Sequence, residues 1–258
     1  MSASLQIASF LGQFGDAIEF IFEERESVSG GVQVGGLGEM WEFTREHLRV
    51  SALAVMIACA VAMPIGLWLG HIGKGEFLAI SISNVGRAVP TLALLAFFIA
   101  YLGVGTTNVV LVLVLLAIPP ILTNTYVGTR QVDPTTVDAA RGMGLTEVQI
   151  VRKVRLPLAL NTIFGGIRTS SVGVVATATI APLASVDTLG TPIISSNVYG
   201  EAGQLGAAIL VAVLTLAIDL LLAGVQRAVT PEGLKQRRDT GPGRRFSLPL
   251  LRRGEQVT

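Results

Sequence analysis

The sequence is short of charge and of cysteine, and each shortage excludes a class of protein. Only 14% of its 258 residues are charged and 51% are hydrophobic, whereas about a quarter of the residues in a soluble domain are charged. The single cysteine, Cys59, lies within an apolar run, so we expect no disulfide framework within the chain. The composition therefore predicts a membrane protein.

Residues suited to catalysis or metal binding are equally scarce. The two histidines, His47 and His71, fall outside the predicted spans, and the lone cysteine has no evident partner. A membrane-embedded enzyme would need such groups to converge at one depth. We therefore expect no catalytic residue, no metal site, no cofactor bound by this chain and no nucleic-acid partner, with a membrane-embedded enzyme kept as an alternative.

Lysine and arginine are absent from residues 1–22, so we expect no secretory signal peptide there. Apolar side chains recur at helical spacing over residues 5–22 and predict an amphipathic helix, with a face formed by Ile7, Leu11, Phe14, Ile18 and Ile21. Its opposite face is acidic and would not attract anionic lipid. We expect the helix to pack against the protein's own bundle, a sixth span being the alternative, and residues 23–38 to form a glycine-rich linker.

Five apolar segments are long enough to cross a membrane, which takes about 20 residues each. Arg87 and Pro90 divide the second, where we expect a short tilted piece followed by a firmer helix over residues 91–102. The third apolar segment ends in Pro119-Pro120. Small residues in the fourth segment predict a central, closely packed helix. The expected fold is an all-α bundle of five core transmembrane helices plus the N-terminal amphipathic helix, with spans at residues 50–70, 77–103, 105–125, 158–184 and 204–225.

One long polar stretch, VDAARGMGLTEVQIVRKVRLP at residues 137–157, interrupts the apolar sequence. It begins with Asp138-Ala139-Ala140, places Gly144 six residues after the aspartate, and closes on Leu156-Pro157. This pattern predicts two short helical pieces hinged at a glycine. The basic residues of the stretch are suited to hydrogen bonds with acidic groups of a partner or with lipid headgroups: Arg141, Arg152, Lys153 and Arg155.

The distribution of basic residues predicts the topology. The polar stretch and the tail from Arg227 to Arg253 are basic, whereas residues 185–203 contain no lysine or arginine. Basic loops remain cytoplasmic, so the polar stretch and the C-terminus are expected inside a cell membrane. We divide the chain into an N-terminal helix and linker at 1–48, a transmembrane domain at 49–229 and a basic tail at 230–258.

Asp138-Ala139-Ala140, Gly144 and Leu156-Pro157 resemble the "EAA" loop of permease subunits in binding-protein-dependent ABC importers. The family pattern has Glu-Ala-Ala, a glycine six residues after the acid and a closing Leu-Pro. This sequence differs in carrying Asp138 in place of glutamate. Five spans, with the loop between the third and the fourth, are similar to the core of methionine-type importer permeases.

Other stretches resemble the glycine betaine, choline and osmoprotectant branch of this family. They are His47-Leu48, the run Pro64–Leu67, and RAVPTLALL at 87–95, which is similar to the branch's TIPSLALL. Relatives often carry Gly-Ala-Gly-Gly-Leu-Gly after the penultimate span, where residues 184–190 read ASVDTLG. This departure leaves the solute open among glycine betaine, choline or proline betaine and, as the alternative, an amino acid such as methionine.

The resemblance implies that the polar loop contacts a separate ATPase subunit, which binds ATP and magnesium, through Asp138, Ala139, Ala140, Arg141, Gly142, Gly144, Leu156 and Pro157. The chain has no phosphate-binding loop of its own, because GHIGK at 70–74 lacks the required spacing. The resemblance also implies two further partners. One is an extracytoplasmic solute-binding protein, and the other is a second permease subunit, either identical to this chain or different from it. An ATP-independent transporter would leave the loop motif unexplained.

Charged residues within the spans need partners or water. Arg168 lies about 16 Å from Pro157, and Asp219 about 10 Å from Gln226, at about 1.5 Å per helical residue. We predict an Arg168–Asp219 ion pair, with separate snorkelling or water-facing roles as alternatives. Arg87 and Pro90 are candidates for a gate or for the solute pathway, and an arginine snorkelling to the interface is the alternative for Arg87.

Overall fold

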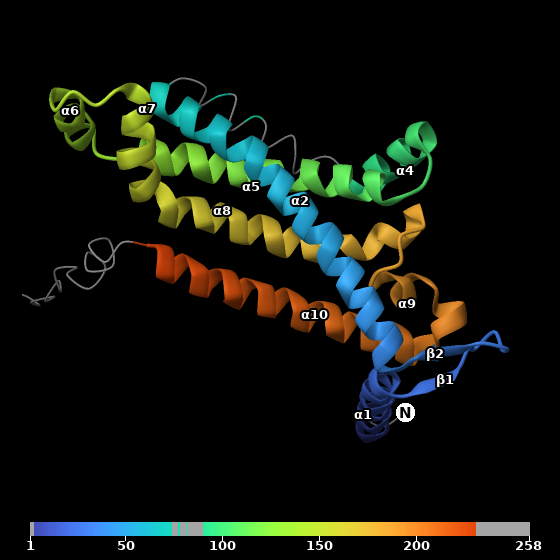
Figure 1. Cartoon of the computed structure of the whole chain (residues 1–258). Coiled ribbons are helices and arrows are strands. Elements are labelled where there is room, and N and C mark those ends of the chain that lie inside the picture. Colours follow the sequence, from blue (N-terminus) through green and yellow to red (C-terminus); the bar gives the residue numbers. More distant parts are fainter. Residues whose placement is uncertain (1–2, 74–76, 78–80, 82–89, 231–258) are drawn as a thin grey trace, which may run out of the picture.

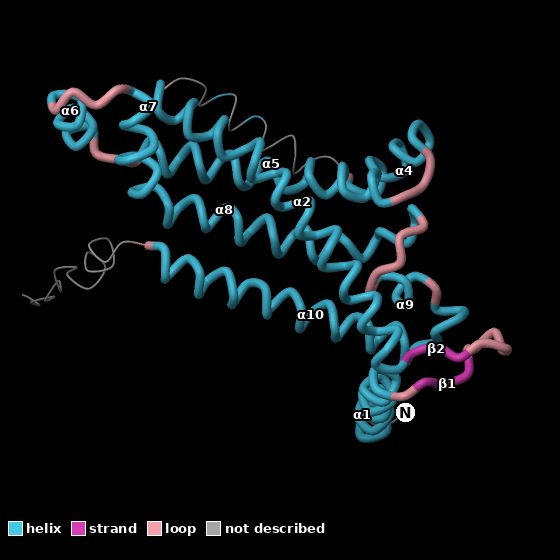
Figure 2. Tube along the Cα trace, viewed as in Figure 1, coloured by secondary structure: helices cyan, strands magenta, loops and turns pink. Residues whose placement is uncertain are grey.

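A computed structural model of the chain describes residues 3–73, 77, 81 and 90–230, and its side chains from residue 12 onward (Figure 1). Within these residues the chain is helical apart from short loops and two small strands (Figure 2). The predicted all-α membrane bundle is confirmed. Arg87 and the tail beyond Thr230 lie outside the described residues.

Four helices of the described chain are long and apolar enough to cross a membrane. A shorter apolar helix, α4 (Thr91–Leu102), follows Pro90 with the bounds that the sequence predicted. The end of α2 lies beside the polar loop, whereas α4 contacts the opposite end of the bundle. The long helices are α2 (Gly36–Ile72), α5 (Thr106–Arg130), α8 (Leu156–Thr177) and α10 (Ser196–Val229).

Helices α2 and α5 pack through a row of small residues. A Cβ added to Gly66 would lie 2.7 Å from the Thr125 side chain, and one added to Gly70 would lie 2.7 Å from that of Thr129. Gly66 and Gly70 are four residues apart, and so are Thr125 and Thr129, so the glycines of α2 and the threonines of α5 follow one contact line. Small side chains allow this approach where lipid supplies no hydrophobic drive between helices.

Helix α5 does not end at Pro119-Pro120, as the sequence suggested, but continues to Arg130. The Asn124 amide donates to the Pro120 carbonyl at 2.8 Å, and the Ser170 hydroxyl of α8 donates to the Ala117 carbonyl at 2.9 Å. The second bond ties α8 to α5 beside the two prolines, and packing against neighbouring helices makes proline tolerable within a membrane helix.

Helix α8 lies in the middle of the bundle between α5 and α10, as its small residues predicted (Figure 1). It is preceded by a π-helical turn, η1 (Val151–Arg155), and followed by a 3₁₀ segment, η2 (Ala178–Ala184). A short helix, α9 (Gly190–Ile194), then leads into α10. Helix α10 therefore begins eight residues before the predicted Gln204, with a bend at Gly200.

The N-terminal helix, α1 (Ala3–Phe22), packs on α10 and α2, as expected for a helix held by the bundle. The predicted apolar face is wrong in part, because Ala17 and Phe20 are fully buried whereas Ile18 is half exposed. Glycines of α10 decide the contact: a Cβ at Gly206 would lie 2.8 Å from the Ala17 carbonyl oxygen. The small residue Ala17 therefore faces α10.

Residues 23–38, predicted as a linker, instead form a hairpin and the start of α2. Strand β1 (Glu24–Glu26) pairs antiparallel with β2 (Gln33–Gly35). Helix α2 then begins at Gly36 and contains both His47 and His71. His47 is fully buried, and its Nε2 donates to the Val175 carbonyl of α8 at 2.8 Å.

The seam between α2 and α5 yields a stability test. Gly66→Ala should lower the free energy of unfolding by about 1–3 kcal/mol, because its Cβ would overlap Thr125 and overpacking costs about that much. Gly224→Ala is the matched control, since a Cβ there meets no atom within 4 Å. Thermal unfolding in detergent measures both, and equal midpoints would contradict the close approach at Gly66.

Candidate functional site: the polar loop and an ion pair between helices

The polar loop consists of two short helices joined at a glycine, as the sequence predicted. The Asp133 carboxylate caps the first helix by accepting from the Thr135 amide at 2.9 Å. Thr146 and Gln149 form a reciprocal capping box on the second. The pieces are α6 (Pro134–Gly142) and α7 (Glu147–Ile150).

Gly144 ends the first helix in a left-handed conformation, with φ of 83°. The following amide, of Leu145, donates to the Ala140 carbonyl at 3.2 Å and closes the helix end. Side chains other than glycine rarely adopt this backbone conformation. The glycine of the motif is therefore required by the turn itself.

Arg141 links the two pieces of the loop. Its guanidinium contacts Asp138 at 3.0 Å and Glu147 at 2.9 Å, and Glu147 also accepts from His71 Nε2 at the end of α2, at 2.8 Å. The hydrogen bond with Glu147 raises the pKa of the Arg141 guanidinium above its ordinary value. Arg141 thus connects the two helices of the loop and, through Glu147, connects the loop to α2. The Arg141 guanidinium is therefore already paired within the chain.

Arg155 is also turned inward. It is only 8% exposed, and its Nη1 donates to the Thr129 carbonyl at 2.7 Å. This carbonyl is in the last turn of α5, where backbone acceptors lack helical partners and a cation is favoured. Arg155 therefore joins the π-helical turn to α5, and the expectation that it faces a partner is wrong, whereas Arg152 and Lys153 are exposed.

The small residues of the motif divide between a core and a surface. Ala140 is 2% exposed and packs with Val137 and Ile150 in the loop's own apolar core, so it does not belong to an outer surface. Met143 and Val148 are strongly exposed beside the open part of the loop. The sequence argument missed these two. The motif's exposed residues are Asp138, Ala139, Arg141, Gly142 and Gly144, while Leu156 and Pro157 are half-buried at the start of α8.

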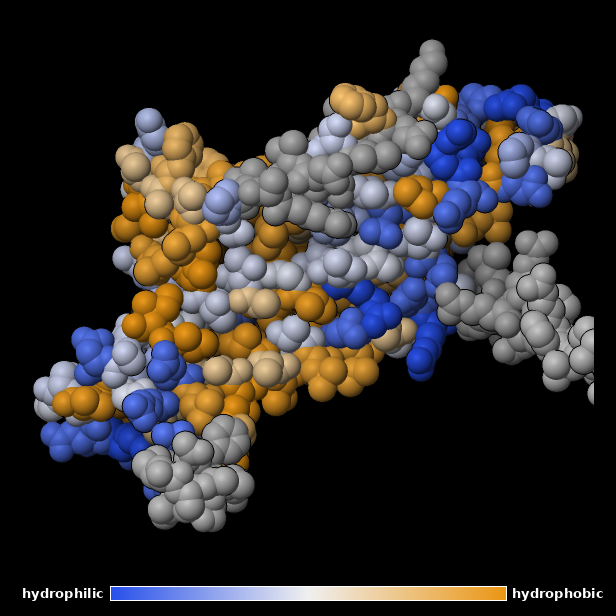
Figure 3. Space-filling model, turned by 180° about the vertical axis from the view of Figure 1, so that it is seen from behind, coloured by the Kyte–Doolittle hydropathy of each residue, from blue (hydrophilic) through white to orange (hydrophobic). Residues whose placement is uncertain are grey.

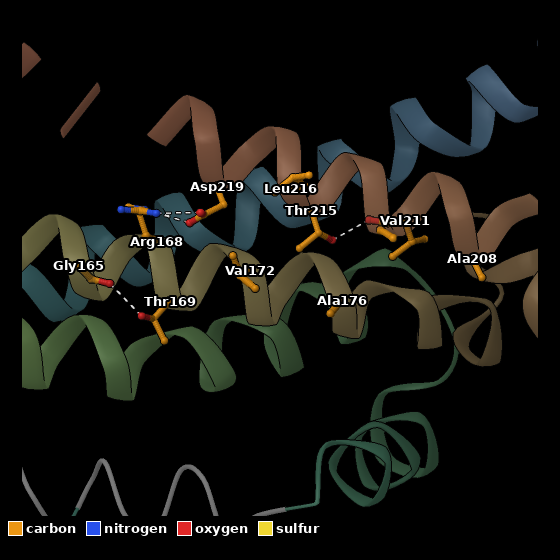
Figure 4. A pocket seen from close by; sticks show the side chains of 11 residues that line it. Gly165, Arg168, Thr169, Val172, Ala176, Ala208, Val211, Thr215, Leu216 and Asp219 are labelled. Carbon is orange, nitrogen blue, oxygen red and sulfur yellow. Dashed lines mark hydrogen bonds and ion pairs between the residues drawn. The ribbon is translucent and has the colours of Figure 1, made fainter. Parts of the chain in front are cut away.

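The structure brings Arg168 of α8 and Asp219 of α10 together (Figure 4). The contact is bidentate, with Nε–Oδ1 at 3.0 Å and Nη2–Oδ2 at 2.8 Å. Arg168 also donates to Gln226 at 3.2 Å, and the Gln226 amide donates to the side chain of Asn161 at 2.9 Å. A polar network thus clamps one half of α10 to α8.

A groove of about 900 Å³ runs between α8 and α10 from the ion pair. Figure 4 shows the lining side chains of the two helices facing one another. Its walls are small or apolar apart from two threonines and the ion pair, and comprise Gly165, Arg168, Thr169, Val172, Ala176, Ala208, Val211, Ala212, Thr215, Leu216 and Asp219. Each charged side chain is 31% exposed, so the pair can be reached from the groove.

The remaining candidate site residues lie apart from this network. Pro90 precedes the first turn of α4, where its extended backbone starts the helix. Its partner in the prediction, Arg87, lies outside the described residues. Within residues 3–73, 77, 81 and 90–230, no three His, Cys, Asp or Glu side chains are placed to hold a metal ion.

Residues 62–232 match the family described as the inner membrane component of binding-protein-dependent transport systems. Two relatives in Bacillus subtilis (strain 168) are 38% identical: the choline transport system permease protein OpuBB and the glycine betaine/carnitine/choline transport system permease protein OpuCB. Each alignment covers 77% of this chain and 92% of the relative.

The fold is similar to that of a solved permease. A chain of the MetNI methionine ABC transporter in an inward-facing conformation superposes with a TM-score of 0.66 at 21% identity. The match covers 76% of this chain and 98% of that chain.

The ion pair can be tested by exchanging its charges. Arg168→Asp and Asp219→Arg should each lower the unfolding temperature, because either leaves two like charges between α8 and α10. The double exchange should recover most of the loss, and Arg227→Asp, an exposed change near the end of α10, is the control. Thermal unfolding of the purified variants checks this, and a double variant no more stable than the singles would contradict the pairing.

Proposed function

The chain belongs to the family of inner membrane components of binding-protein-dependent transport systems, and we propose that it is the permease subunit of an ATP-driven importer for a quaternary-amine osmoprotectant. The observation that carries the proposal is its similarity, over nearly their whole length, to permeases named for choline, glycine betaine and carnitine. These solutes share a quaternary ammonium group. The chain is thus a multi-pass membrane transport subunit, and its solute class is inferred from its relatives.

The polar loop supports a division of labour in which ATP is hydrolysed on a separate subunit. We assign the loop and the C-terminus to the cytoplasm, where its basic residues favour placement. The exposed Met143 and Val148, beside the open backbone at Gly142 and Gly144, offer an apolar and sterically open contact to a groove in the ATPase. The charged side chains of Asp138 and Arg141 are exposed on the same loop as this contact area.

Three internal contacts suit this loop to transmit movement to the bundle. His71 and Glu147 attach it to α2, Arg155 attaches it to α5, and the π-helical turn continues directly into α8. Displacement of the loop by closing ATPase subunits would therefore move three long helices together. Rocking of these helices against a second permease subunit would expose the pathway alternately to the two sides.

The remaining assignments follow from the same proposal. A second permease subunit completes the pathway, because one bundle supplies half of it, and residues 49–229 form the transmembrane domain. A separate extracytoplasmic protein binds the solute. None of the residues lining the groove between α8 and α10 is aromatic, so we place the aromatic cage that recognises a quaternary ammonium in that protein.

Methionine import is the second candidate. The fold is similar to that of the methionine transporter's permease, but at 21% identity this likeness supports the fold alone. The relatives of higher identity favour an osmoprotectant.

Uptake by cells separates these candidates. Cells lacking this chain should lose uptake of labelled choline, glycine betaine or carnitine under salt stress, and the intact gene should restore it. Methionine and proline uptake, with and without added salt, serve as controls. Loss of methionine uptake alone would contradict the osmoprotectant assignment.

Gly144 provides a test of the loop. Gly144→Val should abolish co-purification of the ATPase subunit while leaving membrane insertion intact, because valine at a positive φ distorts the end of α6 at a cost of about 1–2 kcal/mol or more. Gly38→Val is the control, since Gly38 lies at the far end of α2 with no atom within 4 Å of an added Cβ. Undiminished co-purification with Gly144→Val would count against the docking role.

A further inference from the structure

The end of the molecule opposite the polar loop carries the opposite charge. Residues 1–49 contain eight aspartates and glutamates, three arginines and no lysine. Figure 3 shows hydrophilic side chains gathered at both ends of the bundle, and mostly apolar ones with some hydrophilic ones between them. Of the three arginines, Arg49 pairs with Glu46 at 3.0 Å and Arg25 lies over the Phe20 ring at 5.5 Å. This end has fewer basic residues than the polar loop and the tail, which suits the outer side of the membrane.

The hairpin of β1 and β2 projects from this acidic end beside α1 (Figure 1). Its connection to the bundle is firm: the Ser27 hydroxyl and the Val28 amide both donate to the Val198 carbonyl of α10, at 3.0 Å each. Val34 is 4% exposed and packs in one core with Phe20, Met40, Phe43 and Leu189. The base of the hairpin is therefore part of the folded bundle.

The tip of the hairpin, residues 28–32, carries apolar side chains that the bundle does not cover. Val28 is 70% exposed and Val32 63%, on either side of Ser29-Gly30-Gly31. The turn is closed by backbone hydrogen bonds, because the Ser27 amide donates to the Val32 carbonyl at 2.8 Å and the Gly30 amide to the Ser27 carbonyl at 2.9 Å. A pre-shaped apolar tip lowers the ordering cost of binding a partner.

We propose that this hairpin tip, with the carboxylates of Glu24 and Glu26 beside it, is a docking point for the extracytoplasmic solute-binding protein. The proposal rests on the proposed function, which places the ATPase at the opposite end. The family depends on a binding protein by its description, and the hairpin lies outside the matched residues 62–232. It is therefore outside the part of the sequence that defines the family, and it suits recognition of this transporter's own partner.

The charge of the hairpin decides between a protein and a lipid surface as the occupant. Glu24 and Glu26 lie on β1, with Glu23 immediately before it. Anionic headgroups repel such a strand, whereas a basic edge on a binding protein would attract it and accelerate encounter. The valines then supply the apolar contact at the centre, within a polar rim.

The experiment measures binding of the purified solute-binding protein to the complete transporter in nanodiscs. Val28→Ser together with Val32→Ser should raise the Kd roughly tenfold, as truncation of central contact residues does, without changing the unfolding temperature. Val104→Ser is the control, because Val104 is a similarly exposed loop valine, at 60%, between α4 and α5. Glu24→Gln with Glu26→Gln should weaken binding and reduce its dependence on salt.

The outcomes separate this proposal from the proposed function. If the unaltered transporter binds the protein and the tip variants bind equally well, the docking point is wrong and the importer assignment stands. An equal loss with Val104→Ser would likewise overturn a special role for the tip. If the unaltered transporter binds no solute-binding protein, both are overturned. A tip effect seen only in anionic nanodiscs, and not in neutral ones, would assign the tip to lipid and overturn the proposal.

Discussion

The bundle depends on one constraint: in a bilayer, polar groups must find partners within the protein, because no water is present to hydrate them. Several polar groups described above meet this requirement by reaching another helix. His47 of α2 bonds a carbonyl of α8, Ser170 of α8 bonds a carbonyl of α5, and Arg168 of α8 pairs with Asp219 of α10. The same contacts that satisfy polar groups therefore fix which helices are neighbours. Small residues between them let the backbones approach closely enough for these bonds to form.

The polar loop follows the same logic at the end of the bundle. Its core residues hold it in shape, Arg141 pairs with Asp138 and Glu147, and Arg155 bonds the last turn of α5. Its exposed large apolar side chains, Met143 and Val148, lie beside the open backbone of the two glycines. A loop that is rigid inside and open outside can receive force from a partner and pass it to α2, α5 and α8. The acidic hairpin at the other end has the same organisation, with a bonded base and an apolar tip.

The sequence predicted most of the architecture, because hydrophobic length and basic residues report directly on membrane crossing. It also predicted the hinge at Gly144 and the pairing of Arg168 with Asp219, since their depths agreed. It failed where tertiary contact decides: Pro119 and Pro120 do not end α5, which packs against both α2 and α8, and α1 turns Ala17 inward because Gly206 faces it. Nothing in the order of residues distinguished Ala139, which is exposed, from Ala140, which is buried. The hairpin was missed because two strands of three residues carry too little pattern.

The central claim is that the polar loop contacts a separate ATPase subunit. The most direct measurement is cross-linking of the assembled transporter from a single cysteine, with Cys59→Ala removing the native thiol. From Met143→Cys, a reagent joining thiols to amines should give a covalent product with the ATPase subunit. From Val32→Cys, at the opposite end, it should give none. Failure of Met143→Cys to yield that product, or an ATPase product from Val32→Cys, would contradict the account.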